Sequence, residues 1–312
     1  MNLPAILSAY QLGTLINSSP LHGGAMHHTF HVTTEQGEFV VKHLNQELEQ
    51  FHTLEVTEAV ATAAKIQGFP ARTALLCDKK AVFIDNAHAY IIYPYLHGDM
   101  ISAEQLTPQH IQHMATASAT LHQLTLSQPD APTFKPFMIQ EAEWSHYMGS
   151  FSHVLTPRLS QFLEIATRHL SAFERLKQHT VVSHRDFTPG NLLWQNDHSF
   201  SVIDWELAGW INPELEMLNN AIDTANTESG IKTDNVFCYL AAYKQAMGHL
   251  RESPMDLIYG CLGSWVHWIL FCLKRQNHDF KPLNTEKMIR QSLHVIDFLL
   301  ENANDIAKIL LN

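Results

Sequence analysis

The first third of the chain alternates short apolar runs with polar, glycine-containing turns, which is the pattern of β-strands joined by tight connections. We expect five strands there, at residues 21–32, 39–42, 74–77, 81–84 and 89–93. Residues 46–67 between them have apolar positions at helical spacing, and this segment ends at Gly68. The pattern therefore predicts a five-stranded sheet with one long helix, preceded by a short helix within residues 1–16.

Beyond residue 98 the pattern becomes mainly helical. Helices are expected at residues 107–124, 141–176, 235–250, 255–275 and 285–303, and the second of these is expected to be broken at Thr156-Pro157. One β-hairpin interrupts them, because two apolar runs at 191–194 and 200–203 flank the turn-forming stretch 195–198. The chain is thus expected to be an α+β protein with a small β-rich part and a larger helical part.

Three polar residues frame this hairpin. Asp186 stands before it, Asn191 follows five residues later, and Asp204 closes the second strand. One carboxylate can orient an acceptor hydroxyl, while an amide oxygen and a second carboxylate can hold magnesium. The spacing therefore indicates phosphoryl transfer from a magnesium nucleotide, with Asp186 as the catalytic residue and Asn191 and Asp204 as metal ligands.

The segments HRDFTPGN (184–191) and IDWELAG (203–209) resemble the aminoglycoside phosphotransferase/choline kinase superfamily. The second segment is most similar in form to the choline, ethanolamine and thiamine kinase branch. The resemblance implies a two-lobed, protein-kinase-like fold with ATP and Mg²⁺ as cofactors. It divides the chain into a nucleotide-binding lobe (1–93), a hinge (94–98) and a helical lobe (99–312) that carries the catalytic loop, the metal loop and the acceptor site.

The resemblance also implies where the nucleotide phosphates bind. Gly23 and Gly24 correspond to the loop that covers them, where glycine lets the backbone approach closely. Lys42 corresponds to the lysine that contacts the α- and β-phosphates. A carboxylate from the following helix is expected to pair with Lys42, and both Glu55 and Glu58 are candidates because they lie three residues apart on one helix face.

The stretch YPYLHG (93–98) matches the family hinge. Proline lacks an N–H but keeps its carbonyl, so Pro94 is expected to accept from the adenine amino group while the Leu96 N–H donates. Two histidines near the motifs are interpreted as structural: His122 within the helical lobe and His184 as a brace for the catalytic loop. Glu216 stands where the family usually has aspartate, which leaves its bracing role open.

The acceptor is expected to be a small molecule with a hydroxyl group. Trp265 and Trp268 lie three residues apart and resemble the paired tryptophans that choline kinases use for a quaternary ammonium group. With Trp205, Trp210 and Glu206 they would form an aromatic and acidic pocket for a cationic amino-alcohol. The alternative is that residues 262–270 form an ordinary core helix, since apolar positions follow the same helical spacing.

Other functions remain as alternatives to this reading. An aminoglycoside, homoserine or sugar kinase of the same superfamily would share the motifs, and a catalytically silent nucleotide-binding protein would share the fold. Every chemical position is filled here, which disfavours the silent protein. A protein kinase is disfavoured because the metal motif is Asp204-Trp205-Glu206 and no activation segment follows it.

The bulk properties are those of a globular protein. The 312 residues carry a formal charge of −11, which opposes binding to nucleic acid or anionic membranes. The four cysteines are scattered and the N-terminus lacks a cationic start, which favours a reducing, cytoplasmic setting without membrane insertion. The sequence gives no indication of the oligomeric state.

Overall fold

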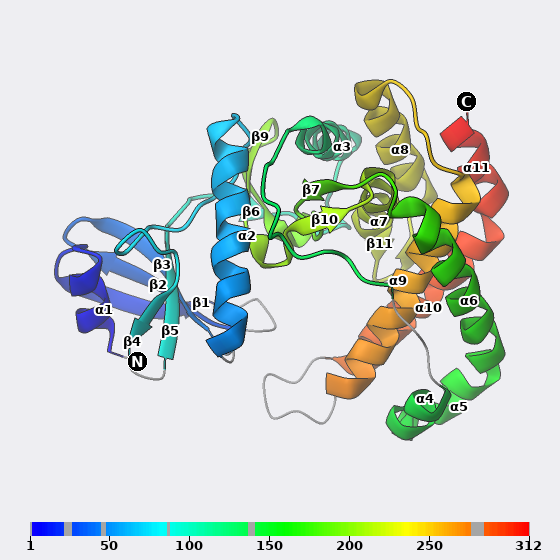
Figure 1. Ribbon diagram of the computed structural model, residues 1–312, viewed down its shortest axis with the longest axis horizontal. Coiled ribbons are helices and arrows are strands. Elements are labelled where there is room, and N and C mark those ends of the chain that lie inside the picture. The colour runs from blue at the N-terminus through cyan, green and yellow to red at the C-terminus, as the bar shows by residue number, and fades with distance from the viewer. Residues whose placement is uncertain are drawn as a thin grey trace.

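The computed structural model describes residues 2–21, 27–44, 48–85, 88–136, 141–275 and 284–311. These residues form a small lobe built around a β-sheet and a larger, mostly helical lobe beside it (Figure 1). The expected α+β architecture is therefore present.

The first part of the chain contains α1 (Leu3–Ala9), β1 (Leu15–Leu21), β2 (His28–Thr34), β3 (Gly37–Leu44), α2 (Leu48–Ile66), β4 (Phe83–Asp85) and β5 (His88–Pro94). The second part begins with β6 (Asp99–Met100), α3 (Pro108–Gln123), α4 (Glu141–Tyr147), η1 (Gly149–Phe151), α5 (Ser152–Leu155), η2 (Thr156–Arg158) and α6 (Leu159–Leu176). It continues with β7 (Val181–Ser183), η3 (Pro189–Asn191), β8 (Leu192–Asn196), β9 (Ser199–Val202), η4 (Trp205–Leu207), β10 (Gly209–Ile211) and α7 (Pro213–Ala225). It ends with β11 (Asn226–Thr227), β12 (Gly230–Ile231), α8 (Thr233–Met247), α9 (Pro254–Arg275), α10 (Thr285–Glu301) and α11 (Ala303–Leu311).

The small lobe holds a five-stranded antiparallel sheet in the order β1-β2-β3-β5-β4. Helix α1 packs on one face, where Val41 and Ile92 are buried. Helix α2 packs on the other face, against Val40 and Ile91. Strands covered on both faces need apolar residues on both sides, which explains the runs FVV (39–41) in β3 and AYIIY (89–93) in β5.

Five strands were expected and the sheet has five, but they do not cover the same residues. Strand β1 was not predicted, because its central residues are exposed and polar and give no hydrophobic alternation; only residues 15 and 16 fell within the range given to the short helix. Residues 74–77 were predicted as a strand, and they form none. Leu75 makes a single backbone hydrogen bond to Ile92 (2.7 Å), and Cys77 turns back onto Lys80.

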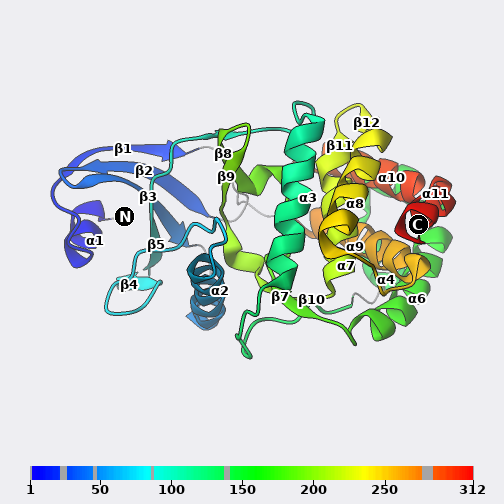
Figure 2. The same cartoon turned by 90° about the horizontal axis from the view of Figure 1, so that it is seen from above.

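Helix α2 joins the two lobes. Its first turns contribute Phe51 and Leu54 to the sheet, whereas Val60, Ala61 and Ala64 belong to the core of the large lobe. The view from above shows α2 between the sheet and the large lobe (Figure 2). The position of the sheet relative to the large lobe is therefore fixed by packing as well as by the connecting chain.

The connection after β5 runs close to the β8–β9 hairpin. Strand β6 pairs with β8, so that Asp99 lies opposite Trp194. A Cβ atom on Gly98 would lie 2.5 Å from the Trp194 carbonyl oxygen. Only glycine fits this approach without a shift of the backbone, which makes residue 98 a fixed point between the lobes.

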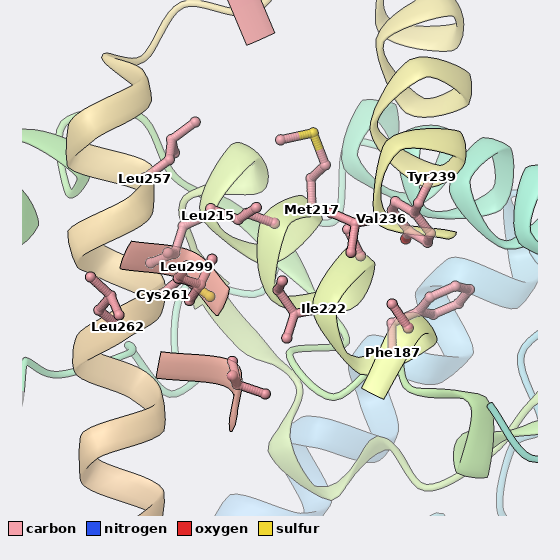
Figure 3. Packing of buried hydrophobic residues seen from close by; sticks show 14 of the residues in the cluster. Phe187, Leu215, Met217, Ile222, Val236, Tyr239, Leu257, Cys261, Leu262 and Leu299 are labelled. Carbon is pink, nitrogen blue, oxygen red and sulfur yellow. The ribbon is translucent and has the colours of Figure 1, made fainter. Parts of the chain in front are cut away.

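The large lobe is a layered helical bundle around α7 and α9. Leu215 and Ile222 of α7 belong to the same continuous apolar cluster as Cys261 and Leu262 of α9 (Figure 3). By length and composition alone, α9 is apolar enough to cross a membrane. In the structure 61% of its apolar window is buried, as in the central helix of a helical core. The break predicted near residue 156 is present, where η2 separates α5 from α6.

Candidate active site

The segment from β7 to β10 lies on the edge of the large lobe that faces α2 and the sheet (Figures 1 and 2). Strand β7 pairs with β10, and β8 pairs with β9 in the expected hairpin. Phe187 is fully buried and contacts Phe69 and Phe200, so its ring anchors the loop between β7 and β8 in the core. The polar residues of this loop are thereby held at the junction of the lobes.

Asp186 and Asn191 form one hydrogen-bonded unit. The Asn191 amide nitrogen donates to the carbonyl oxygen of Asp186 (2.8 Å) and to its carboxylate (2.7 Å). Burial and the nearby charge of Asp204 raise the pKa of Asp186 to about 7, against the opposing hydrogen bond from Asn191. A carboxylate with a raised pKa is suited to accept a proton near neutral pH.

His184 braces this loop, as the sequence suggested. Its Nε2 donates to the carbonyl oxygen of Ile203 (3.0 Å), and its Nδ1 accepts from the Asp186 backbone N–H (3.3 Å). Burial lowers the pKa of His184, so the ring is neutral and serves as a donor on one side and an acceptor on the other. His184 thus links the catalytic loop to the metal loop.

A buried acid on α7 supports the loop that contains Arg185 and Asp186. Glu216 of α7 accepts from the Arg185 backbone N–H (2.6 Å) and from His122 Nε2 (2.9 Å). Burial alone would raise the pKa of Glu216, but its hydrogen bonds, above all that from His122, hold it below the usual range. The position that departs from the family aspartate therefore keeps a bracing role, and His122 is structural, as expected.

Lys42 reaches across the junction to the metal loop. Its ammonium group hydrogen-bonds to Asp204 (3.1 Å) and to Glu206. His27, just before β2, contacts the other oxygen of Glu206 (2.9 Å). Burial would lower the pKa of Lys42, but the two acids raise it above the usual value. Burial would raise the pKa of Glu206, but Lys42 and His27 lower it to about 2.

These contacts differ from two expectations. Glu206 was expected in the acceptor pocket, but it bonds to Lys42 of the small lobe. Glu55 and Glu58 were expected to offer Lys42 a partner, but Glu55 accepts from the backbone N–H groups of residues 81 and 82 (3.0 and 2.8 Å). Glu58 accepts from the Tyr93 hydroxyl (2.5 Å) and the Ala74 N–H (3.2 Å). Both acids are occupied by local donors of the small lobe, which a motif comparison does not reveal.

The four tryptophans do not form one pocket. Trp205 is 1% exposed, lies edge-on to Phe69 and donates its indole N–H to the Val202 carbonyl oxygen (3.1 Å), so it is a core residue. Trp210 lines a cavity of ≈ 360 Å³ together with Phe134 and Phe173.

The two tryptophans of α9 also lie in different surroundings. Trp265 is partly buried, and its side chain lies beside that of Cys261. Trp268 is 38% exposed and stacks on Phe271 (ring centroids 5.0 Å apart). The helix is therefore a core helix on one face, and only Trp265 lies toward α7.

The remaining nucleotide-site residues are placed as follows. Pro94 ends β5 opposite Phe39, and Leu96 is partly buried in the connection that follows. Their places agree with a hinge, while contact with adenine stays a prediction. Gly23 and Gly24 lie outside the described residues.

The donor set fits a divalent cation. Asn191 uses its amide nitrogen on Asp186, which leaves the amide oxygen as its remaining polar atom, and Asp204 uses only one carboxylate oxygen on Lys42. Carboxylate and amide oxygens are the ligands that magnesium prefers. Within the described ranges, no three His, Cys, Asp or Glu side chains are already gathered around a common point. Nucleotide phosphates would therefore have to complete the coordination.

Sequence reasoning missed Asp223, which lies near the end of α7. Burial and the charge of Asp186 raise its pKa from 3.8 to about 8. The titratable groups that face it are Asp186 from the catalytic loop, Cys261 from α9 and Tyr239 from α8. No motif includes this position, and its helical spacing from Glu216 was the only available signal.

This raised pKa has a consequence for stability. Between about pH 4 and 8 the folded protein keeps a proton on Asp223 that the unfolded chain releases, so stability falls as pH rises through this window. Asp223→Asn removes the penalty and is expected to stabilise the protein by about 1–3 kcal/mol more at pH 8 than at pH 5. Urea unfolding at both pH values measures this, with Asp234→Asn at an exposed position of α8 as the control. An equal gain at both pH values would contradict the assignment.

The chain is similar to known proteins of one family. A family model described as "Phosphotransferase enzyme family" matches residues 18–219, and the chain belongs to this family. No curated protein sequence matches it.

Three solved structures illustrate the similarity. Spectinomycin phosphotransferase APH(9)-Ia in complex with ADP and spectinomycin is 13% identical over 96% of both chains (TM-score 0.70). A choline/ethanolamine kinase family protein from Mesorhizobium loti is 17% identical over 98% of this chain and 93% of that chain (TM-score 0.66). Amicoumacin kinase hAmiN in complex with AMP-PNP, Ca²⁺ and Ami is 13% identical over 96% of this chain and 94% of that chain (TM-score 0.67). These similarities confirm the predicted two-lobed, kinase-like fold, and with the family match they identify the protein as a phosphotransferase.

Proposed function

We propose that this phosphotransferase moves the γ-phosphoryl group of ATP, with Mg²⁺, to a hydroxyl group of a small cationic amino-alcohol. The observation that carries the proposal is the convergence of Asp186, Asn191 and Asp204 with Lys42 at the junction of the lobes. A cytoplasmic setting, where ATP is available, goes with this proposal.

The chemistry follows from the positions of these groups. Asp186 accepts the proton of the acceptor hydroxyl, whose oxygen forms a new bond to the γ-phosphorus. The bond from that phosphorus to the bridging oxygen breaks, and ADP leaves with the electron pair. The carboxylate is held for this task by Asn191 and by the His184 and Glu216 braces behind the loop.

Lys42 neutralises the phosphates. In the structure its ammonium group is bonded to Asp204 and Glu206, so it already points to the metal loop. Asn191 and Asp204 would hold the metal ion. When bound, magnesium offsets the charge of the phosphates and orients the γ-phosphoryl group.

The acceptor class rests on the charges around the site. Asp186 and Asp223 bring two acidic groups close together, and a bound cation would favour their ionised forms, which supports a cationic acceptor over an anionic one. An amino-sugar antibiotic is the second candidate, because the spectinomycin phosphotransferase has the same fold over 96% of the chain. A sugar kinase or a catalytically silent nucleotide-binding protein is less compatible with this set of residues.

Release of ADP from magnesium-ATP tests the proposal directly. The acceptors are choline, ethanolamine, thiamine, homoserine and kanamycin, with Asp186→Ala as the inactive control. We expect acceptor-dependent ADP release with at least one cationic alcohol and none in the variant. ATP binding without transfer to any acceptor would favour the silent nucleotide-binding protein.

The Lys42→Met variant tests the proposed contact between Lys42 and the phosphates of ATP. Removal of the ammonium group is expected to lower kcat/KM for ATP by about 30- to 1,000-fold, because its interaction with phosphate strengthens as charge develops in the transition state. Lys65→Met is the matched control, since Lys65 is an exposed lysine of α2 that bonds only to Thr73 (3.3 Å). Initial rates at varied ATP measure the effect. A change in kcat/KM of less than about threefold would show that Lys42 does not interact with the phosphates of ATP.

A further inference from the structure

Three histidines gather at one end of the small-lobe sheet. His28 begins β2, His43 follows Lys42 near the end of β3, and His88 begins β5. His28 lies opposite His43 across the β2–β3 ladder, and His43 lies opposite Tyr90 across the β3–β5 ladder. Because side chains alternate along a strand, His43 and Lys42 point to opposite faces of the sheet. This histidine cluster is therefore on the face of the sheet that Lys42 does not use.

The histidine cluster lies at the end of the sheet face that α1 covers. Val41 and Tyr90, each two residues from a member of the cluster, are buried in the apolar group that contains the side chains of α1. His43 is partly buried, whereas His28 and His88 are exposed. An ion from solvent can therefore reach the ring nitrogens, while the backbone that carries them is held in the sheet.

Two members of the cluster meet through their ring nitrogens. Nε2 of His43 lies 3.2 Å from Nδ1 of His88, and the two ring planes are inclined by 63°. The His43 ring also stacks on Tyr90, with centroids 4.9 Å and planes 21° apart, which fixes its orientation. Burial and the neighbouring histidines lower the pKa of His43, so its imidazole is in the neutral form that binds metal ions.

The separation of these nitrogens fits two bonds to one metal ion. Zinc–imidazole bonds of about 2.0–2.1 Å that span 3.2 Å enclose an angle of about 100–106°, close to the tetrahedral angle of about 109°. Imidazole suits zinc, copper and nickel, whereas magnesium and calcium prefer oxygen ligands. Across the described part of the chain, no three His, Cys, Asp or Glu side chains converge on one point. An ion here would therefore have two protein ligands, with water in its other positions.

We propose that His43 and His88 bind a divalent transition-metal ion, and that zinc is the ion that fits best. The ion joins β3 to β5, and each ring then carries its proton on its other nitrogen. Asp85 of β4 lies opposite His88, so its negative charge on the same face favours a bound cation. The inference goes beyond the proposed function, because neither histidine takes part in phosphoryl transfer. The alternative is a hydrogen-bonded pair of neutral histidines that binds no metal.

Calorimetric titration with Zn²⁺ tests the inference on the full chain without a histidine tag. We expect the tightest site to bind one zinc ion per chain. His43→Asn and His88→Asn should each weaken it by at least about tenfold, since loss of even an outer partner of a metal ligand costs about 10–100-fold in affinity. Excess Mg²⁺ should not displace the zinc. Zinc affinities in both variants that equal that of the wild type would overturn the inference.

Two further variants locate the bound ion. His31→Asn is the matched control, because His31 lies on the same strand as His28 but on the opposite face, where it bonds to Glu38 (2.8 Å). Asp204→Asn removes a candidate ligand of the magnesium site. Both variants should bind zinc as the wild type does. Zinc binding that is lost in Asp204→Asn and kept in His43→Asn would assign the ion to the metal loop and overturn the inference.

Thermal unfolding gives a second readout that needs no enzymatic activity. A ligand that binds only the folded chain raises Tm, and free zinc at a hundred times its Kd should raise the Tm of the wild type by about 4 °C. The double variant His43→Asn/His88→Asn should show no such rise relative to its own zinc-free Tm, which corrects for any change in stability caused by the substitutions. An equal rise in the wild type and the double variant would contradict the inference.

Discussion

Replacement of Asp186 by asparagine is expected to lower acceptor phosphorylation by about 10²–10⁴-fold while ATP still binds. Asparagine keeps the shape of the side chain but cannot take a proton from the acceptor hydroxyl. The loop geometry should persist, since Asn191 still finds the Asp186 carbonyl oxygen and the replaced side chain keeps an oxygen acceptor. Steady-state kinetics and nucleotide titration measure the two quantities separately.

The matched control is Asp197→Asn, at the turn between β8 and β9. Its side chain is 81% exposed and lies in the same segment without facing the catalytic loop, so its rates should stay within about twofold of the wild type. A decrease in activity of equal size in both variants would show that the hairpin, and not the carboxylate of Asp186, governs turnover.

Replacement of Glu216 by alanine is expected to lower the free energy of unfolding by about 3–5 kcal/mol. The carboxylate is fully buried, and its loss leaves His122 Nε2 and the Arg185 backbone N–H without their acceptor. Because Arg185 precedes the catalytic Asp186, activity should fall even in the fraction that remains folded. Urea unfolding followed by circular dichroism measures the first effect, and kinetics at a temperature well below the unfolding transition measures the second.

Glu174→Ala provides the comparison for Glu216. Glu174 is an exposed acid of α6 that pairs with Lys177, and its replacement should cost less than about 1 kcal/mol. Stability losses of similar size in the two variants would contradict the bracing role of Glu216. Glu216→Gln, which keeps two polar atoms in the same place, should recover part of the lost stability.

The motifs could predict which loops carry the candidate catalytic residues, because these residues lie close together in sequence. Asp186, Asn191 and Asp204 are tied to a hairpin whose apolar runs and turn are visible in the chain, and the structure forms that hairpin. Helices α3, α6, α8, α9 and α10 of the large lobe were similarly marked by long stretches of helical spacing, whereas α11 was not predicted. Strand β1 could not be predicted, because its central residues are exposed and polar and show no alternation of apolar and polar positions.

Partners that lie far apart in sequence could not be predicted. Lys42 and Glu206 are separated by 164 positions, and nothing in either motif favours this pair over Glu55 or Glu58. Helical spacing identifies residues on one face but not what that face meets. Trp265 and Trp268 were equally plausible pocket residues, yet only Trp265 turns toward α7. Asp223 was missed for the same reason, since its significance comes from the neighbours that folding brings to it.

Phosphorus NMR of the reaction products tests the central claim most directly. Purified protein is incubated with magnesium-ATP and ethanolamine or kanamycin, beside a matched sample of Asp186→Asn. The account predicts a phosphate monoester on the acceptor oxygen together with one ADP for each ester formed, and neither product in the variant sample. ADP and inorganic phosphate as the only products, formed at equal rates in both samples, would contradict it.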